Sequence, residues 1–445
     1  MKYKAALVPD WFRKGSVYQI NPRTFSEKGT IKAVTEQLPF LADLGFEVMY
    51  LCPIFEEDDS TDISNWSNRQ KASKTGNPKN PYRMNDYFKI DSEYGTMDDL
   101  REFVKESHRL GMKVMLDLVY LHIGPNAPIL KKHPEFAKQD DKGNIILSEW
   151  RFPLLDYSCE GLREYLYCNM CYYVGEIGVD GFRCDVGDGV PLDYWKEGLH
   201  RIRTINPEAV MIDEGSNPDY LTVFHSLYAF HWHDCIYNII SGSASVTLLR
   251  EKWEENHMKI PKGGIFLRDM DNHDTVTDWK DRVEKIVGHN GMELILALNY
   301  VIDGIPMVYC GNELADTAKL SMFANRFHMG SFEVTDRSVA DRPYSIRRQN
   351  VIKKLNLMKK ECDALSSGET VWLDNSAPEK IISFMRELGD KRIIFIGNLS
   401  DQEIEGRIND FPLNVSKTLL ESEEAVKLGE NGYIIPPYGY TVAEM

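Results

Sequence analysis

A cation and an anion lie two residues apart in the short apolar segment that runs from Asp180 to Asp185. If this segment is a strand, Arg183 and Asp185 project from the same face, because successive side chains on a strand alternate. A neighbouring guanidinium favours the ionised form of a carboxyl group, and an ionised aspartate is able to act as a nucleophile. The same spacing also occurs in structural ion pairs at strand ends, so the rest of the chain must separate these two interpretations.

Further acids and imidazoles follow other segments that resemble buried strands. They are Asp117 and His122 after the third predicted strand, Asp213 and Glu214 after the fifth, and His273 and Asp274 after the seventh. Like charges that converge in a cleft repel one another unless chemistry requires them there. The pattern therefore favours a reactive site over a set of solvated surface charges.

Two carboxyl groups about 5 to 5.5 Å apart, one ionised and one protonated, can perform retaining glycoside hydrolysis. We assign the ionised role to Asp185, beside Arg183. Glu214 is the candidate acid: it has no cation in its own sequence neighbourhood and has other carboxylates nearby, so its pKa should be raised. Asp274 and His273 could then donate or accept hydrogen bonds at sugar hydroxyls and strengthen them in the transition state.

Strands and helices alternate along most of the chain. The expected strands are residues 17–20, 47–52, 113–119, 181–185, 209–213, 265–269 and 305–309, with a sixth strand somewhere in 223–232. Helices are expected over 31–44 and 97–110, each ending at a glycine. This alternation indicates parallel strands joined by helical crossovers. Eight such strands predict an α/β fold, the (β/α)8 TIM barrel, whose site lies at the C-terminal ends of its strands.

The alternation is interrupted twice. We expect the barrel to comprise residues 1–121 and 161–366, with the polar, proline-rich segment 122–160 as a small inserted subdomain after the third strand. From residue 367 the pattern changes to short runs of period two, which predicts an antiparallel β-sandwich domain over 367–445. The polar stretch 56–79 is expected to be a long functional loop.

Composition narrows the class of protein. The chain has 445 residues, of which 43% are hydrophobic and 27% charged, as in ordinary globular proteins. Its net charge of −16 argues against nucleic-acid and anionic membrane partners but is compatible with a neutral sugar. It has no apolar stretch of about 18 residues and no signal-peptide core before Pro9. The scattered cysteines fit a reducing compartment, so we expect a cytoplasmic protein.

Taken in order and spacing, these motifs resemble those of the α-amylase family of glycoside hydrolases, over residues 16 to about 445. The matching segments are 117–122, 181–185, 212–214 and 271–274, supported by 17–25, 82–96, 152–156 and 304–313. The resemblance implies Asp185 as nucleophile, Glu214 as general acid and base, and Asp274 as transition-state stabiliser. It implies that the groups around the sugar are Tyr82, His122, Arg183, His273 and Asp117, with Tyr82 stacked on the ring.

Two positions depart from the family pattern. Leu121 stands where the family usually has an asparagine that binds calcium, and its side chain offers no oxygen to a hard cation. We therefore expect that calcium site to be absent, and we expect no metal or other cofactor. After Glu214 the chain continues with Gly215 and Ser216 instead of the aromatic residue common there, so the leaving-group side of the cleft is expected to be unusual.

Three functions remain open at this point. The first is a retaining hydrolase, similar to an α-amylase or α-glucosidase, that cleaves α-glucosidic bonds in malto-oligosaccharides. The second is a transglycosylase that uses the same covalent intermediate with a sugar acceptor, which sequence does not distinguish because water and sugar attack one species. The third is a sugar-binding relative without activity, which the complete set of acids disfavours.

Overall fold

The computed structural model describes residues 4–277, 281–326, 333–409, 412–429 and 432–445. Within these residues eight parallel strands close into a barrel, in the order β1-β10-β9-β8-β7-β6-β5-β2. The strands are β1 (Val17–Ile20), β2 (Val48–Leu51), β5 (Lys113–Leu118), β6 (Gly181–Cys184), β7 (Val210–Asp213), β8 (Ser226–Tyr228), β9 (Phe266–Arg268) and β10 (Ile305–Tyr309). The predicted barrel is confirmed, and β8 is its sixth strand.

Alternating burial explains why these strands close on themselves. Val17, Val48 and Tyr50 belong to an inner cluster of apolar residues, whereas Tyr18 and Met49, one position along, pack with the outer core. A strand that is buried on both faces needs apolar residues at every position, as parallel sheets covered by helices do. The inner cluster fills the barrel, so its interior is a packed core and not a pore.

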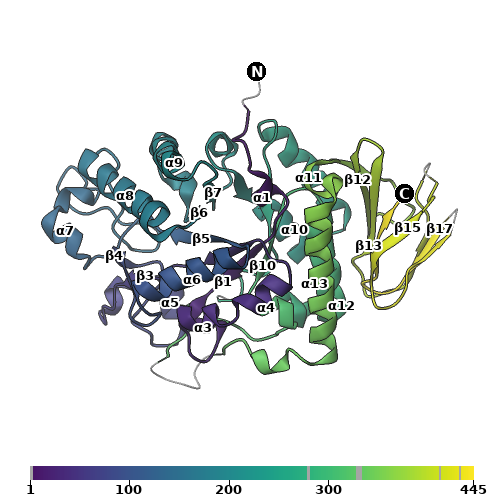
Figure 1. Cartoon of the computed structure of the whole chain (residues 1–445), viewed down its shortest axis with the longest axis horizontal. Helices are drawn as coiled ribbons and strands as arrows, with labels where there is room; N and C mark the ends of the chain where they lie inside the picture. Colours follow the sequence, from purple (N-terminus) through teal and green to yellow (C-terminus); the bar gives the residue numbers. More distant parts are fainter. Residues whose placement is uncertain (1–3, 278–280, 327–332, 410–411, 430–431) are drawn as a thin grey trace.

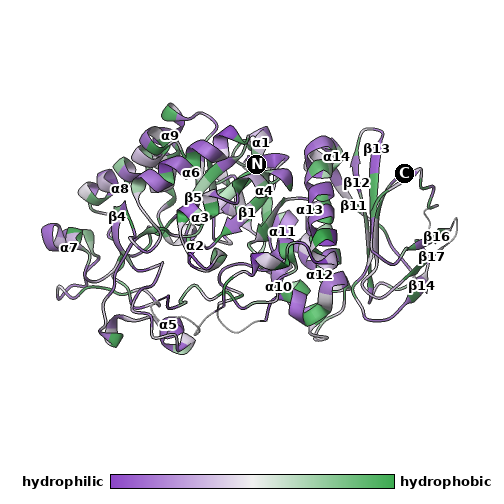
Figure 2. Cartoon of the chain, turned by 60° about the horizontal axis from the view of Figure 1, so that its bottom comes forward, coloured by the Kyte–Doolittle hydropathy of each residue, from purple (hydrophilic) through white to green (hydrophobic). Residues whose placement is uncertain are grey.

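Helices surround the barrel (Figure 1). The longer ones are α6 (Met97–Arg109), α8 (Glu160–Tyr172), α9 (Leu192–Ile205), α10 (Phe230–Ile240), α11 (Thr247–Lys259), α12 (Val283–Val301) and α13 (Pro343–Glu361). The shorter ones are α1 (Asp10–Arg13), α2 (Pro22–Phe25), α3 (Ile31–Thr35), α4 (Leu38–Asp43), α5 (Asn68–Ser73), α7 (Pro128–Lys132) and α14 (Asp363–Ser367). Many of the helices alternate between hydrophobic and hydrophilic residues (Figure 2), as expected when one face is buried.

One predicted helix is two. The single helix expected over residues 31–44 is divided into α3 and α4, with Pro39 in the first turn of α4. Proline has no backbone N–H, and it disfavours helical conformation in the residue before it, so a helix tends to restart at proline instead of continuing through it. The helix expected over 97–110 is α6, whose start is fixed by a capping box between Thr96 and Asp99.

Two long segments leave the barrel at the C-terminal ends of its strands. β3 (Phe55–Glu57) pairs antiparallel with β4 (Met84–Ile90), and the residues between them carry α5, so the loop expected over 56–79 is partly ordered into secondary structure. Residues 122–159, after β5, carry α7 and several isolated β-bridges. Figure 1 shows α7 on the side of the molecule opposite the C-terminal sheets.

The end of the chain is all-β. A sheet in the order β11-β12-β13-β18-β15 faces a smaller one, β14-β17-β16. Their strands are β11 (Glu369–Trp372), β12 (Ile381–Leu388), β13 (Lys391–Asn398), β14 (Ile404–Gly406), β15 (Lys417–Glu421), β16 (Lys427–Gly429), β17 (Gly432–Ile435) and β18 (Tyr440–Glu444). Side chains of the larger sheet alternate between its two faces. Phe384 and Phe395 pack with the main core, whereas Ile394 and Ile396 pack with residues of the smaller sheet.

Two further observations concern helix length and the cysteines. No helix among the described residues is long and apolar enough to cross a membrane. All eight cysteines lie in the described part of the chain, and each is a free thiol.

Candidate active site

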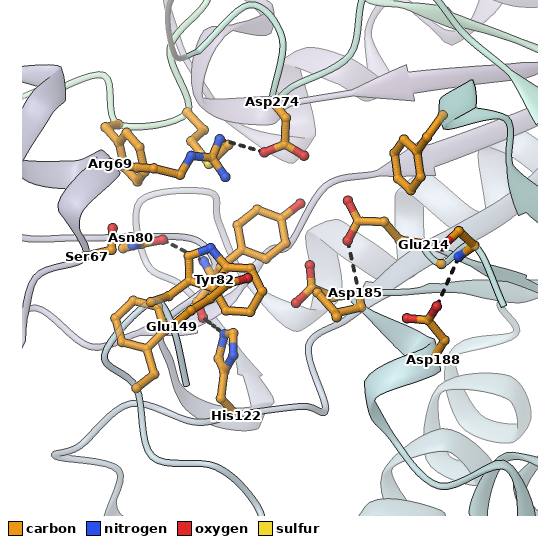
Figure 3. A pocket seen from close by; sticks show the side chains of 18 residues that line it. Ser67, Arg69, Asn80, Tyr82, His122, Glu149, Asp185, Asp188, Glu214 and Asp274 are labelled. Atoms are coloured by element: carbon orange, nitrogen blue, oxygen red, sulfur yellow. Dashed lines mark hydrogen bonds and ion pairs between the residues drawn. The ribbon is translucent and has the colours of Figure 1, made fainter. Parts of the chain in front are cut away.

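The barrel brings five of the predicted site residues to one cavity. Its volume is about 340 Å³, and it is lined by Tyr82, His122, Asp185, Glu214 and Asp274 among others (Figure 3). Asp185 follows β6 directly, Glu214 follows β7, and Asp274 lies beyond β9, so each carboxylate comes from the C-terminal end of its strand. The cavity therefore lies where a barrel of this type places its site.

One guanidinium joins three of the acids. Arg183 is fully buried, and its Nη1 lies 2.7 Å from Oδ1 of Asp117 and 3.0 Å from Oδ1 of Asp185. Its Nη2 lies 2.6 Å from Oε1 of Glu214. The sequence showed no cation in the sequence neighbourhood of Glu214; the structure provides one from another strand, because β6 and β7 are adjacent in the barrel, with Arg183 paired to Ile212. A cation remote in sequence thus reaches the acid across two neighbouring strands.

The pKa values of the two central carboxyls move in the same direction. Burial raises the pKa of Glu214 well above its usual range; Arg183 opposes this and Asp185 adds to it. Burial also raises the pKa of Asp185 to about 7, although Arg183 opposes it. The expected effect of Arg183 on Asp185 is present, but desolvation outweighs it. The pair therefore retains protons to higher pH than isolated carboxyls would.

Asp274 behaves differently. Burial opposes its ionisation, but His273 and Arg69 outweigh burial and hold the pKa of Asp274 below its usual range. The Nη2 atom of Arg69 lies 2.7 Å from Oδ1 of Asp274, and Nε2 of His273 lies 3.3 Å from Oδ2. Asp274 is therefore the carboxylate of the cavity that is most firmly anionic.

A hydrogen-bond chain fixes the orientation of His273. The Nε2 amide of Gln19 donates to Nδ1 of His273 over 2.8 Å, and the hydroxyl oxygen of Tyr82 lies 2.6 Å from Nε2. Burial lowers the pKa of His273 to about 4, so the ring is neutral at pH 7. Because Nδ1 accepts, the ring proton is on Nε2 and points toward Tyr82 and Asp274.

The wall of the cavity around His122 is aromatic. His122 donates from Nε2 to the backbone oxygen of Tyr82 over 3.0 Å, and burial lowers its pKa to about 4. Its ring packs against Trp150 and Phe152, with centroids 5.5 and 5.0 Å away. All four residues line the cavity, so this wall offers flat apolar surfaces of the kind that cover sugar rings.

Three predicted residues do not line the cavity. Asp117, Arg183 and His273 are 1%, 0% and 1% exposed and lie behind it. Asp117 also accepts from the hydroxyl groups of Tyr50 and Tyr82, at 2.5 and 3.1 Å. The structure places these three residues where they orient the groups that do face the cavity.

Several lining residues were not found from the sequence. Arg69 and Asp188 are charged, and Phe230 and Phe323 are aromatic. Asp188 accepts from the backbone N–H groups of Ser216 and Asn217, at 3.0 and 3.2 Å, beside Glu214. Phe230 is the first residue of α10, whereas Arg69 and Phe323 lie in long segments that leave the barrel after its strands. The path of such segments follows from tertiary contacts, so spacing gave no signal for them.

Leu121, the residue that offers no oxygen to a cation, has a defined packing partner. The Cδ1 atom of Leu121 lies 3.1 Å from where a Cβ on Gly189 would stand, so Leu121 packs against the turn after Asp185. Across the part of the chain that the structure describes, no group of three or more His, Cys, Asp or Glu side chains is arranged to hold a metal ion.

The fold is a parallel eight-stranded barrel, and the C-terminal ends of its strands bring two carboxyl groups to one cavity. Barrel enzymes place their active sites at this end of the strands. The model of the α-amylase catalytic domain matches residues 7–146. A cyclomaltodextrinase of Thermoanaerobacter pseudethanolicus is 23% identical over 97% of this chain and 78% of its own. An intracellular maltogenic amylase of Bacillus subtilis is 22% identical over 88% of this chain and 69% of its own.

Solved structures agree on the fold. An α-amylase from Lactobacillus plantarum matches with a TM-score of 0.81 and 22% identity, covering 98% of this chain and all of that one. A maltogenic α-amylase from Thermotoga neapolitana matches with a TM-score of 0.79 and 24% identity, covering 98% and 99%. The catalytic-domain model and the curated relatives support the resemblance to the α-amylase family, a family of glycosidases. The resemblance and the enzyme class expected from the sequence are thereby confirmed.

Proposed function

We propose that the protein is a retaining glycoside hydrolase that cleaves α-glucosidic bonds in malto-oligosaccharides or related α-glucans. The observation that carries this proposal is that Asp185 and Glu214 both line one cavity and both contact the guanidinium of Arg183. The relatives named cyclomaltodextrinase and maltogenic amylase support the substrate class.

The geometry suggests a role for each acid. Glu214, whose pKa is raised, donates its proton to the glycosidic oxygen as the bond to the anomeric carbon breaks. Asp185, as the anion paired with Arg183, forms a bond to that carbon, which gives a covalent glycosyl-enzyme. Glu214, now a carboxylate, then removes a proton from water, and the attack of this water releases Asp185.

Asp274 supports the transition state. Positive charge develops on the sugar ring, and an anionic carboxylate in the same cavity stabilises it. Because His273 and Arg69 keep Asp274 ionised, it can also accept hydrogen bonds from sugar hydroxyls over the whole working pH range. Tyr82 and His122 supply the surface against which the ring is held.

The test is hydrolysis of maltose to maltoheptaose by the wild type and by Asp185→Asn. The variant keeps the size of the side chain but lacks the nucleophile, so reducing-sugar release should fall by several orders of magnitude. Asp390→Asn, in an exposed turn of the C-terminal sheets, is the matched control. NMR should show the α-anomer first; an initial β-anomer, or equal activity in Asp185→Asn, refutes the mechanism.

Transfer to a sugar is the second candidate. Asp188, Ser216 and Phe230 line the cavity on the side of Glu214, where the attacking group must enter, and they offer polar and aromatic contacts to an acceptor. Chromatography of products from one oligosaccharide separates the two functions: products longer than the substrate mean transfer. Titration calorimetry that showed sugar binding without turnover would instead support a binding protein.

We further propose an oligosaccharide as the partner, and a cytoplasmic location. The free cysteines and the relative named an intracellular maltogenic amylase support this location. Cell fractionation with an antibody to the chain tests it.

A further inference from the structure

The cavity has two chemically distinct ends. Glu214 must protonate the oxygen of the leaving group, so the leaving part of the substrate lies on its side, together with Asp188. The sugar that reacts with Asp185 lies on the other side, and its non-reducing end points away from Glu214. Figure 3 shows Arg69, Ser67 and Asn80 on that far side.

On the side away from Glu214, one wall of the cavity is the loop between β3 and β4, which is held in place by hydrogen bonds. The loop between β3 and β4 would be free to move if only its ends were held, but Arg83 is fully buried beneath it. The guanidinium of Arg83 donates to the backbone oxygens of Asp58, Asn65 and Pro78, over 2.8, 3.0 and 2.7 Å. Charge-assisted hydrogen bonds of this kind are among the stronger ones. The wall therefore has a defined position.

The opposite wall comes from the segment after β10. Its residues Met322 and Phe323 line the cavity. The backbone oxygen of Met322 accepts from Nη1 of the buried Arg23 over 2.6 Å, and its N–H donates to the hydroxyl of Thr277 over 2.8 Å. This wall is therefore also held in place, by Arg23 in α2 and by Thr277 beyond β9.

The two walls are joined to each other by hydrogen bonds between residues close in sequence to those that line this side of the cavity. Nδ2 of Asn77, in the first wall, donates to the backbone oxygen of Ala324 in the second over 2.8 Å. Nδ2 of Asn325 donates in return to the backbone oxygen of Thr75 over 3.1 Å. A chain of sugars that continued between the two walls would have to break these contacts.

Arg69 stands at the joined end. It lies on α5, whose first turn is capped by the hydroxyl of Ser67 and whose Gln70 donates to the backbone oxygen of Asn77 over 2.9 Å. Its guanidinium reaches across the cavity to Asp274, and its side chain remains 32% exposed. A planar group with several N–H donors is suited to hydroxyl oxygens at the end of a sugar chain.

We propose that the enzyme acts from the non-reducing ends of its substrates, and that Arg69 binds the hydroxyl groups of the terminal sugar. This inference rests on the proposed function, since it names which part of an α-glucan enters that site. A cleft that is open at both ends accepts the interior of a polymer, whereas joined walls on the non-reducing side accept only a chain end.

Two substrates test the inference directly. The first is maltoheptaose labelled with a fluorescent amine at its reducing end. The second is the same molecule with the 4- and 6-hydroxyls of its non-reducing glucose blocked by an ethylidene bridge. With the unblocked substrate, chromatography at low conversion should show labelled products shortened by one fixed unit. With the blocked substrate, kcat/KM should fall at least about 100-fold, because the site loses hydroxyls it was built to bind.

Variants on α5 test the role of Arg69. In Arg69→Ala, kcat/KM for the unblocked substrate should fall roughly 10- to 100-fold, the effect expected on losing a charged hydrogen bond. The ratio between unblocked and blocked substrates should shrink by a similar factor, and Arg69→Lys should restore part of it. Lys71→Ala removes an equal charge from an exposed position on the same short helix and should change neither value.

The outcomes separate the two levels of the proposal. Cleavage of both substrates at similar rates, or a ladder of labelled products from the start, overturns the non-reducing-end inference and leaves the hydrolase intact. An unchanged ratio in Arg69→Ala overturns the role of Arg69. If wild-type enzyme cleaves neither these substrates nor any other α-glucan tested, the proposed function fails and the inference fails with it.

Discussion

The substitution Asp117→Asn isolates the electrostatic coupling behind the cavity. Asp117 lies outside the cavity, but its negative charge raises the pKa of Asp185 through the shared contact with Arg183. Nη1 lies 2.7 Å from an oxygen of Asp117 and 3.0 Å from an oxygen of Asp185. These two oxygens are thus roughly 5 Å apart, where unit charges interact by roughly 3 kcal/mol at an effective dielectric of about 20.

We expect part of that energy to appear as a shift of the pH profile. Asparagine keeps an acceptor for Arg183 but carries no charge, so Asp185 should ionise more readily and its pKa should fall by about one to two units. The acid limb of kcat/KM against pH reports the nucleophile of the free enzyme. It should therefore move to lower pH in the variant, while kcat at its optimum changes much less than in Asp185→Asn.

The assay is initial-rate hydrolysis of maltoheptaose from pH 4 to 9, with urea unfolding in parallel to confirm that the variant is folded. Asp390→Asn serves again as the surface control. An acid limb that stays in place, or moves to higher pH, would mean that Asp117 acts only through packing. The electrostatic account of the three acids around Arg183 would then be wrong.

Three further predictions concern stability. Burial, with Asp188 and Glu214 nearby, raises the pKa of Asp213 well above its usual range, so the folded protein loses stability as pH rises above the unfolded value near 4. Asp213→Asn does not titrate, so its urea midpoint relative to wild type should rise between pH 4.5 and pH 8; a constant difference contradicts this. Val186 has a left-handed backbone with φ of 42°, so Val186→Gly should gain about 1 kcal/mol in urea unfolding. Glycine keeps the backbone N–H that donates to Glu214 over 3.1 Å, so kcat should change little; a loss of stability would show that no strain is stored there. Phe384→Ala, at the contact between the C-terminal sheets and the main core, should cost about 3 to 5 kcal/mol in urea unfolding, and a cost below 1 kcal/mol would mean that the sheets are not part of that core.

The barrel was predictable because its signals are local. Each strand is a short apolar run followed by polar residues, and closure of a parallel barrel brings the strand ends together whatever the loops do. Asp185, Glu214 and Asp274 could therefore be placed at one cavity from spacing alone. The same locality explains the error at residues 31–44, where one proline outweighed the apolar periodicity.

The spacing of residues in the sequence could not predict contacts between neighbouring strands or between the long segments that leave the barrel. The cation beside Glu214 comes from the neighbouring strand, and its identity depends on the register between β6 and β7. Arg69 reaches Asp274 from a loop that is more than two hundred residues away in sequence. The raised pKa of Asp185 depends on burial, which is a property of the whole fold and not of the segment that carries the residue.

The arrangement around Arg183 explains how one barrel can hold an acid and a nucleophile at the same pH. Three carboxyl groups share a single cation in a site from which water is largely removed, so full ionisation of all three would leave excess negative charge buried. Retaining a proton removes part of that excess, and of the three carboxyl groups around Arg183 those of Asp185 and Glu214 line the cavity. Asp274 is outside this competition because Arg69 compensates its charge separately and His273 contacts it as a neutral ring. The difference in protonation that glycoside cleavage needs therefore follows from the number of cations at the end of the barrel, and a second cation beside Glu214 should abolish it.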